Sequence, residues 1–436
     1  MENTYSQINL SEQDLADIVD ELGLVYKIDG NYLLIGIGPS FNDYVLYISV
    51  VLSQLKQILK IIIREIYTEA LSMVVIKDMK TAEDLLTGVF GVDEIGKVIA
   101  VFIPKDREFL SITQKLVMLT QGFKGPEIPG KIHLGELVYT DSNLKLDEAK
   151  SKNKLQVFQD NYLVLSIIKR HIKGNVYKCF YMKGIFNMGF CIIKEGKKSM
   201  WSDHEGRDIK DRLEWQKKIH QDLSDIIDIP KILDLFEENG NTYLVMEYIK
   251  GIALTSVINR TYMGRNWMQL SLTEKNKLLN LLLKILKIIE SIHKKGYIHR
   301  DLSSDNFMIT KKLRIYAIDL ELAYGVNFGY PSPPFQLGTP GYMSPEQIRR
   351  DKPTYKEDIY AIGALMIIFF TNIRPEEFDL QNPNEIFKSI FSYTRDQHIA
   401  ELIVRCLNES LVIRPELHEI NSVLQSILEN SSRGVG

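Results

Sequence analysis

The residues best suited to chemistry lie in one short segment, Tyr297-Ile-His-Arg-Asp-Leu-Ser-Ser-Asp-Asn306. The carboxylate of Asp301 can orient an attacking hydroxyl group and accept its proton. Five residues later, the amide oxygen of Asn306 can reach a metal ion that bridges phosphate oxygens. A carboxylate and an amide at this spacing suit phosphoryl transfer, and His299 and Arg300 are expected to hold the loop.

Further segments follow in an order that strengthens this interpretation. Ile315-Tyr-Ala-Ile-Asp-Leu-Glu321 is an apolar strand that ends in the carboxylate of Asp319, and Gly338-Thr-Pro-Gly-Tyr-Met-Ser-Pro-Glu346 comes next. With Asp358 at the start of an apolar helix and a distant Arg414, they resemble the motifs of protein kinases. In those enzymes the Arg pairs with the Glu that corresponds to Glu346.

The protein kinase resemblance implies a fold, cofactors and site residues. The fold would be α+β and bilobal, with a β-rich small lobe and a helical large lobe. ATP and Mg²⁺ would be the cofactors, with Asp301 as the catalytic carboxylate and with Asn306 and Asp319 as the metal ligands.

The nucleotide side of the site is expected in the smaller lobe. Gly189-Phe-Cys-Ile-Ile-Lys194 resembles the V-A-I-K strand, in which the lysine reaches the α- and β-phosphates. A surface lysine is the alternative, because Lys197 and Lys198 lie nearby. The glycine-rich loop is reduced to Gly174, followed by Val176 over the adenine. The strand 242–248 leads into the hinge, which predicts nucleotide contacts from Met246, Glu247 and Tyr248.

The expected partner of Lys194 departs from the kinase pattern. Active kinases usually pair this lysine with a glutamate on the next helix. Over Arg207 to Leu223, the apolar spacing brings Gln216 to the inward face, whereas Glu214 lies about 200° away around the helix. We therefore predict that Gln216 faces Lys194, as a hydrogen-bonding group without the charge of an ion pair.

Composition limits the class of protein. The chain has 436 residues, 45% of them hydrophobic, and a net charge of −3, which gives no reason to expect nucleic acid as a partner. Three widely spaced cysteines and a polar N-terminus without a secretion signal favour a cytoplasmic location. Polar residues interrupt the apolar run Tyr44 to Ile63, so we expect a buried amphipathic helix there and no membrane span.

The order of patterns predicts five regions. A small α/β domain is expected over 1–140, a linker over 141–160, the small lobe over 161–250, the large lobe over 251–430 and a disordered tail over 431–436. The first domain should contain helices near 11–22, 44–63 and 109–119, and strands near 32–37, 73–76 and 97–103. Strands over 162–193 and a helix over 277–293 are expected in the kinase lobes.

The chain also resembles the class III and IV lanthipeptide synthetases. The resemblance rests on Gly206-Arg-Asp-Ile-Lys-Asp-Arg-Leu213, on Asp301-Leu-Ser303 and on Asp319-Leu-Glu321, which is similar to the D-F-E of that group. Gly96 to Pro104 and Leu137-Val-Tyr139 are similar to segments of its lyase domain. The resemblance implies a kinase that phosphorylates Ser and Thr of a precursor peptide, behind a domain that eliminates the phosphate.

The residues that elimination requires are missing from the matching positions. The family places a Lys and a His on one strand, where this chain has Leu33 and Ile35, and its phosphate-binding Arg is replaced by Thr140. Lys77 and Lys97 remain as possible remnants. The expected first domain is therefore a degenerate lyase that binds the peptide or a partner, and a separate lyase or cyclase is an expected partner.

Two alternatives stay open at this point. One is a regulatory Ser/Thr kinase with an N-terminal sensor domain. The other is a pseudokinase scaffold, suggested by Gln216 and the reduced glycine loop. The presence of Lys194, Asp301, Asn306 and Asp319 argues against the scaffold.

Overall fold

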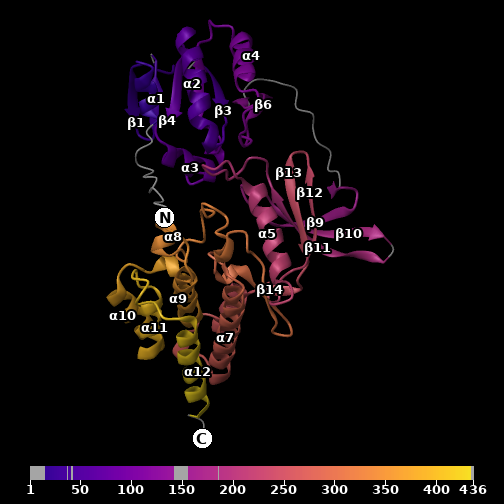
Figure 1. Cartoon of the computed structure of the whole chain (residues 1–436), viewed down its shortest axis with the longest axis vertical. Helices are drawn as coiled ribbons and strands as arrows, with labels where there is room; N and C mark the ends of the chain where they lie inside the picture. The colour runs from indigo at the N-terminus through magenta and orange to yellow at the C-terminus, as the bar shows by residue number, and fades with distance from the viewer. Residues whose placement is uncertain (1–14, 37, 41–42, 142–155, 185, 434–436) are drawn as a thin grey trace. The chain divides into compact units, whose positions relative to one another are not determined.

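The structure is a computed structural model that describes residues 15–36, 38–40, 43–141, 156–184 and 186–433 (Figure 1). By their internal contacts the residues form two compact units. One consists of Met1–Leu213 and Leu235–Leu244, and the other of Glu214–Asp234 and Val245–Gly436. The first unit contains two separate β-sheets, and the second contains the long helices that carry the catalytic loop.

The first sheet has seven strands in the order β1-β2-β4-β5-β3-β7-β6. The strands are β1 (Tyr26–Asp29), β2 (Tyr32–Ile35), β3 (Tyr44–Ile48), β4 (Ser72–Ile76), β5 (Ile99–Ile103), β6 (Ile132–Gly135) and β7 (Val138–Thr140). The helices are α1 (Ala16–Glu21), α2 (Leu52–Thr68), α3 (Met79–Thr87) and α4 (Phe109–Leu119). Helix α2 buries aliphatic side chains at helical spacing, among them Leu55, Ile58, Leu59 and Ile62, so it supplies much of the core.

Two predictions for this region are corrected. Neighbouring strands of the sheet are antiparallel, so the domain is α+β rather than the expected α/β. The expected helix over Tyr44 to Ile63 is wrong in its first part, which is strand β3. Leu46 and Ile48 alternate with less buried residues there, and this period of two is that of a strand. The prediction for α4 is confirmed, and α1 covers the described part of the expected first helix.

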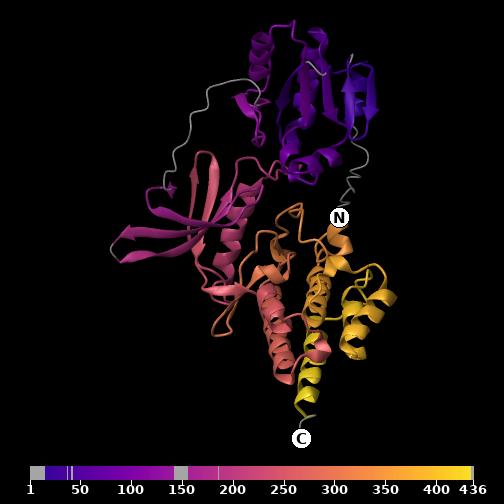
Figure 2. The same ribbon diagram turned by 180° about the vertical axis from the view of Figure 1, so that it is seen from behind.

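The second sheet has six strands in the order β12-β13-β11-β10-β9-β8. They are β8 (Val157–Phe158), β9 (Tyr162–Lys169), β10 (Val176–Gly184), β11 (Asn187–Gly196), β12 (Ile232–Glu238) and β13 (Asn241–Glu247). Helix α5 (Ile209–Leu223) lies between β11 and β12 in the chain. Strands β10 and β11 form a long hairpin that extends beyond the rest of the sheet (Figures 1 and 2).

The large lobe is built around helices. They are α6 (Leu254–Tyr262), α7 (Leu272–Lys294), α8 (Pro345–Arg349), α9 (Tyr355–Thr371), α10 (Pro383–Thr394), α11 (Gln397–Cys406) and α12 (Leu417–Arg433). A capping box of Ser271 and Glu274 begins α7. Helix α9 is apolar on all sides and buried from Glu357 to Thr371, so it is the centre of the lobe.

Short strands of the large lobe position the loops. Strand β14 (Gly251–Ala253) pairs with β16 (Phe307–Thr310), and β16 pairs with β17 (Ile315–Ala317). Strand β15 (Tyr297–Ile298) pairs with β18 (Tyr324–Gly325). The short 3-10 helices are η2 (Val92–Glu94), η3 (Trp267–Gln269), η4 (Ser304–Asn306), η5 (Val326–Phe328) and η6 (Pro375–Glu377).

Two expected regions are only partly described. Residues 142–155 of the expected linker lie outside the described residues, and the part near its end contains strand β8. Helix α12 extends to Arg433, inside the range expected as a disordered tail, and residues 434–436 lie outside the described residues. Within the described chain, we find no helix whose length and apolar character would let it cross a membrane.

Candidate active site

The loop between β15 and β16 holds Asp301 with donors on both carboxylate oxygens. The amide nitrogen of Asn306 donates to Oδ2 of Asp301 at 2.9 Å and to its carbonyl oxygen at 2.7 Å. Thr339, from a segment far along the chain, donates its backbone N–H (3.0 Å) and its hydroxyl (2.7 Å) to Oδ1. Asp301 is therefore fixed in position, as a group that orients a substrate hydroxyl must be.

Besides holding Asp301, Asn306 is expected to bind a metal ion. Because its amide nitrogen is engaged twice by Asp301, its side-chain oxygen is the atom left to face a cation. The backbone carbonyl oxygen of Asn306 accepts the N–H of Ile318 at 3.0 Å. This hydrogen bond ties Asn306 to the residue that directly precedes Asp319. An amide oxygen and a carboxylate fit Mg²⁺, which takes its other ligands from phosphate and water. This pair of ligands stays a prediction.

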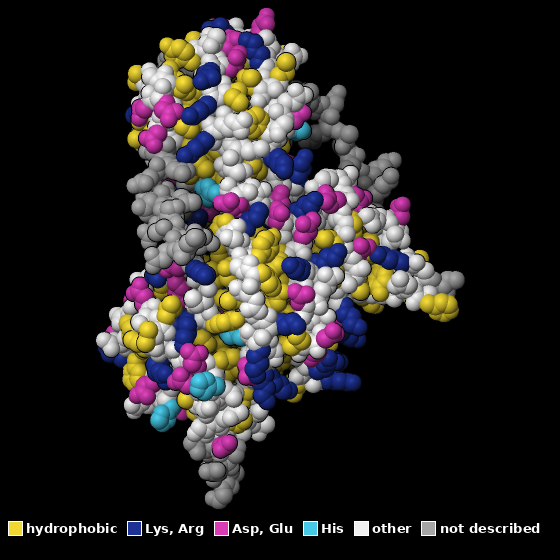
Figure 3. Space-filling model, in the orientation of Figure 1, with side chains coloured by type: hydrophobic (Ala, Val, Ile, Leu, Met, Phe, Trp, Pro, Cys, Tyr) yellow, Lys and Arg dark blue, Asp and Glu magenta, His cyan; other side chains and the backbone are white. Residues whose placement is uncertain are grey.

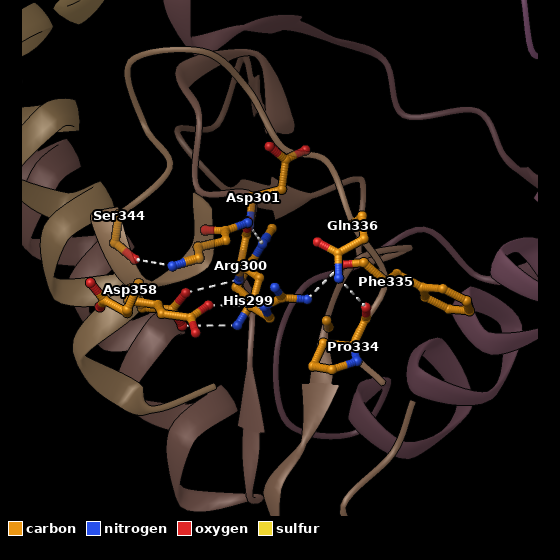
Figure 4. A network of polar contacts seen from close by, with 12 residues as sticks. His299, Arg300, Asp301, Pro334, Phe335, Gln336, Ser344 and Asp358 are labelled. Atoms are coloured by element: carbon orange, nitrogen blue, oxygen red, sulfur yellow. Dashed lines mark hydrogen bonds and ion pairs between the residues drawn. The ribbon is translucent and has the colours of Figure 1, made fainter. Parts of the chain in front are cut away.

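The backbone of the catalytic loop is anchored by Asp358, in the first turn of α9 (Figure 4). Its carboxylate accepts the N–H groups of His299 (2.8 Å) and Arg300 (2.9 Å) and a hydrogen bond from His293 (2.7 Å). Burial alone would raise the pKa of Asp358, but the interactions with His293 and His299 hold that pKa below its usual value. The side chain is therefore a stable anion at the base of the loop.

The side chain of Arg300 points into the lobe, as expected for a residue that holds the loop. It donates to Glu357 (2.9 Å) and to the carbonyl oxygen of Phe335 (2.8 Å), so it joins the loop to the segment that leads to Thr339 (Figure 4). Burial raises the pKa of Glu357 to about 7, although the neighbouring Arg300 lowers it. The nearby Asp358 adds to this rise in pKa.

The predicted pairing of Arg414 with Glu346 is confirmed. Two hydrogen bonds join the side chains, at 2.5 and 2.9 Å, and both side chains are at most 4% exposed. Arg414 also donates to the carbonyl oxygens of Asn408 and Lys356. This buried pair fixes α8, at the end of the segment that carries Thr339.

The nucleotide-binding residues expected in the small lobe lie together on its sheet. Lys194 of β11 is directly opposite Val176 of β10. Gly174 has φ +142°, and a Cβ there would lie 2.0 Å from the carbonyl oxygen of Glu195. The glycine is therefore required by the close approach of two backbone segments. The phosphate contacts of Lys194, and those of Gly174 and Val176 with the nucleotide, stay predictions.

Gln216 has the orientation that the helical spacing predicts. Its side chain is fully buried, and its amide nitrogen lies 3.3 Å from Nε2 of His220 and 3.5 Å from the carbonyl oxygen of Ile318. Glu214 is exposed. The structure confirms the two orientations, whereas the contact of Gln216 with Lys194 stays a prediction.

Replacing Gln216 by Glu is expected to leave the rate of phosphoryl transfer equal to or above that of the native chain. The carboxylate would supply the Coulombic attraction to Lys194 that a neutral amide lacks. Steady-state kinetics of the variant test this, with Glu214→Ala as the matched change on the exposed side of α5. A large loss in both variants would show that Glu214 is the partner of the lysine.

The residues expected to form the hinge lie at the C-terminal end of β13, which is an inner strand of the sheet. Met246 is 4% exposed and so lies within the protein, as a residue behind the nucleotide would. The backbone of Glu247 donates to the carbonyl oxygen of Lys231 at 2.8 Å, which connects the hinge to the strand before it. Contacts of Met246, Glu247 and Tyr248 with a nucleotide remain predictions.

Comparison with known proteins decides the family. The protein kinase domain matches residues 173–429, which is more than half of the 436 residues. The chain belongs to the protein kinase family. The match covers the six-stranded sheet from the glycine loop onward and nearly the whole helical lobe.

Several curated proteins resemble this kinase over its catalytic part. Serine/threonine-protein kinase PknA of Nostoc sp. is 24% identical over 226 residues, which are 50% of this chain and 38% of that protein. Serine/threonine-protein kinase B of Synechocystis sp. is 26% identical over 54% of this chain and 41% of its own length. Serine/threonine-protein kinase PAK 5 of Rattus norvegicus is 28% identical over 39% and 23%. This chain thus spans less than half the length of each of these relatives.

The structure adds residues that the sequence did not single out in the kinase domain. Thr339 and Gln347 hold the catalytic loop, since Gln347 donates to the carbonyl oxygen of Arg300 at 2.9 Å. Glu357 accepts a hydrogen bond from the buried side chain of Arg300 at 2.9 Å. Thr339 belongs to the Gly-Thr-Pro-Gly-Tyr segment that resembles a kinase motif, so the sequence offered a reason to consider its hydroxyl as part of the site. No sequence pattern marked Gln347 or Glu357 in this way.

In the first domain, the two positions expected from the sequence to match the Lys and His of a lyase are buried and apolar. Leu33 is 0% exposed and Ile35 is 6% exposed, and both belong to the core. Polar groups gather elsewhere on the sheet, where Lys97 and Lys131 lie 5.5 and 5.0 Å from the ring centre of Tyr47. Lys97 is ion-paired with Glu94 at 2.9 Å. Burial raises the pKa of Tyr47 to about 12.

Proposed function

We propose that the chain is an ATP- and Mg²⁺-dependent Ser/Thr protein kinase. The observation that carries this proposal is the double restraint of Asp301 by Asn306 and Thr339. In this proposal the restrained carboxylate receives the proton of the substrate, and Asn306 and Asp319 are the oxygen ligands of the metal ion. The relatives named Ser/Thr protein kinases support the class of substrate.

In the proposed reaction, a substrate hydroxyl oxygen forms a bond to the γ-phosphorus of ATP while the bond to the β–γ bridging oxygen breaks. Asp301 orients the hydroxyl and receives its proton. Lys194 binds the α- and β-phosphates, and Asn306 and Asp319 hold the metal. Mg²⁺, when bound, supplies positive charge that offsets the charge on the phosphates. Val176, Met246, Glu247 and Tyr248 enclose the adenine.

We further propose that the substrate is a ribosomal precursor peptide in lanthipeptide-type biosynthesis. The support is the resemblance of Asp301-Leu-Ser303 and Asp319-Leu-Glu321 to the kinase domains of that class. In this proposal the first domain is a degenerate lyase that binds the peptide or a partner enzyme. Leu33 and Ile35 cannot transfer a proton, so these positions cannot supply the acid and base of phosphate elimination.

The purified chain, with ATP, Mg²⁺ and the precursor, is expected to give phosphopeptide without dehydrated peptide. Mass spectrometry distinguishes the two, because the expected products are heavier by one phosphoryl group per modified site. An Asp301→Asn sample serves as the control for background phosphate. Dehydrated peptide would show active elimination through groups such as Lys77 or Lys97. Phosphorylation of casein with none of the precursor would instead favour a regulatory kinase.

A further inference from the structure

A groove of about 520 Å³ lies on the second compact unit, and Asp301 is not among its lining residues. Three segments form it, namely the loop 224–228 after α5, the middle of α7, and the turn between β16 and β17. All of its lining residues belong to the second compact unit. The chemistry proposed for the catalytic loop makes no use of these residues, so the groove needs an explanation of its own.

The lining of the groove includes aliphatic side chains that reach solvent. Ile226 is 43% exposed and Leu313 is 44% exposed, and the partly buried Ile288 of α7 is a third aliphatic lining residue. Leu313 has φ +55°, a left-handed conformation in which Gly, Asn or Asp is the usual residue. An aliphatic side chain is therefore held at a strained turn position where it reaches solvent beside the groove.

The edge of the groove is positively charged. Lys284 and Lys287 of α7 are exposed along one side, and Lys284 donates to the carbonyl oxygen of Leu313 at 3.2 Å. Arg314 lines the other side and is ion-paired with Asp228. The turn before Leu313 also carries two exposed cations, Lys311 and Lys312. Figure 3 shows Lys and Arg side chains gathered beside the lower part of α7.

The charge of this surface is opposite to that of the whole chain. The groove lining has three cations (Lys284, Lys287 and Arg314) and two carboxylates (Asp225 and Asp228), a charge of +1, and the adjacent exposed Lys311 and Lys312 raise it to +3. The chain as a whole carries −3. A ligand that approaches this surface is therefore attracted if it is anionic, and the attraction is lost in salt.

We propose that this groove docks an acidic peptide segment of a protein partner, with an aliphatic anchor residue against Ile226, Ile288 and Leu313. Carboxylates of the segment pair with Lys284 and Lys287 on the edge. The aliphatic side chains of the lining argue against a small inorganic anion, which gains nothing from apolar contact. The lining comes from three segments, the loop after α5, α7 and the β16–β17 turn, so a peptide segment with several side chains can contact all of them.

The test is fluorescence anisotropy of the 436-residue chain with a labelled synthetic peptide of Glu residues and two Leu residues. At about 10 mM ionic strength, where charges act over about 30 Å, the peptide is expected to bind. A Lys284→Glu/Lys287→Glu variant is expected to bind at least about tenfold more weakly, since two attractive pairs become repulsive. Lys105→Glu/Lys277→Glu makes the same change in net charge outside the groove and is expected to leave affinity within about twofold.

Leu313→Asn tests the apolar anchor separately. Asn accepts the left-handed conformation, so the variant is expected to keep its fold while the peptide binds several-fold more weakly. A peptide with Ser in place of Leu should lose affinity for the native chain and show no further loss with Leu313→Asn. ATP turnover should be unchanged in every variant, which separates this proposal from the proposed kinase activity.

Equal binding of the peptide to the native chain and to all groove variants would overturn the proposal. Absence of peptide binding at low salt would overturn it as well. A third contrary result is a chain that binds phosphatidylserine vesicles through Lys284 and Lys287 but does not bind the peptide. The occupant of the groove would then be a membrane surface.

Discussion

Replacing Asp301 by Asn is expected to lower the rate of phosphoryl transfer by about 10²–10⁴-fold, the usual contribution of a positioned acid or base. The substitution keeps the size of the side chain and its carbonyl-type oxygen, so the hydrogen bond from the Thr339 hydroxyl can persist. It removes the group that accepts the proton of the substrate hydroxyl. The loss should therefore appear in turnover rather than in the binding of ATP.

The measurement is single-turnover transfer of labelled phosphate, with nucleotide affinity measured in parallel. Asp305→Asn is the matched control, because Asp305 is an exposed carboxylate four residues away that accepts a hydrogen bond from Thr255. Its rate should stay near that of the native chain. Near-native transfer by the Asp301 variant would remove the basis of the kinase mechanism.

Replacing Arg414 by Met is expected to destabilise the folded state by about 3–5 kcal/mol, the usual cost of leaving one partner of a buried ion pair uncompensated. Glu346 would then be a buried carboxylate without its cation. The carbonyl oxygens of Asn408 and Lys356 would also lose a donor. Denaturant unfolding of the large lobe measures the change.

Two comparisons identify the cause of that loss of stability. Arg405→Ala breaks an exposed ion pair with Glu419 and is expected to cost at most about 1 kcal/mol. The double variant Arg414→Met/Glu346→Leu removes both charges and should recover part of the stability. A cost below about 1 kcal/mol for Arg414→Met alone would show that the pair contributes little to stability.

The parts of the site that depend on local spacing could be predicted from the sequence. Asn306 follows Asp301 within one loop, and β16 and β17 form a short hairpin that returns the chain to Asp319, so these residues are neighbours by connectivity. The inward orientation of Gln216 is likewise a local property, because it follows from the 3.6-residue period of a helix. Such arrangements require no knowledge of the tertiary fold.

Contacts between distant segments could not be predicted in this way. Thr339 reaches Asp301 from 38 positions further along the chain, and Glu357 reaches Arg300 from 57. The boundary between β3 and α2 was missed for a different reason. Apolar residues continue through Val50, Val51 and Leu52, and the N-cap residue Val51 makes no side-chain hydrogen bond, so no local signal marks the start of the helix.

The anchoring of the catalytic loop by Asp358 has a consequence for its motion. The N–H groups of His299 and Arg300 donate to the carboxylate of Asp358 in α9, and that helix is buried from Glu357 to Thr371. Local opening of the loop would leave the Asp358 anion inside the protein without its donors, which costs more than exposing a surface loop. Opening of the loop that carries Asp301, the proposed proton acceptor, is thus coupled to the buried helix α9, and we expect substrate access to come from the movement of other segments.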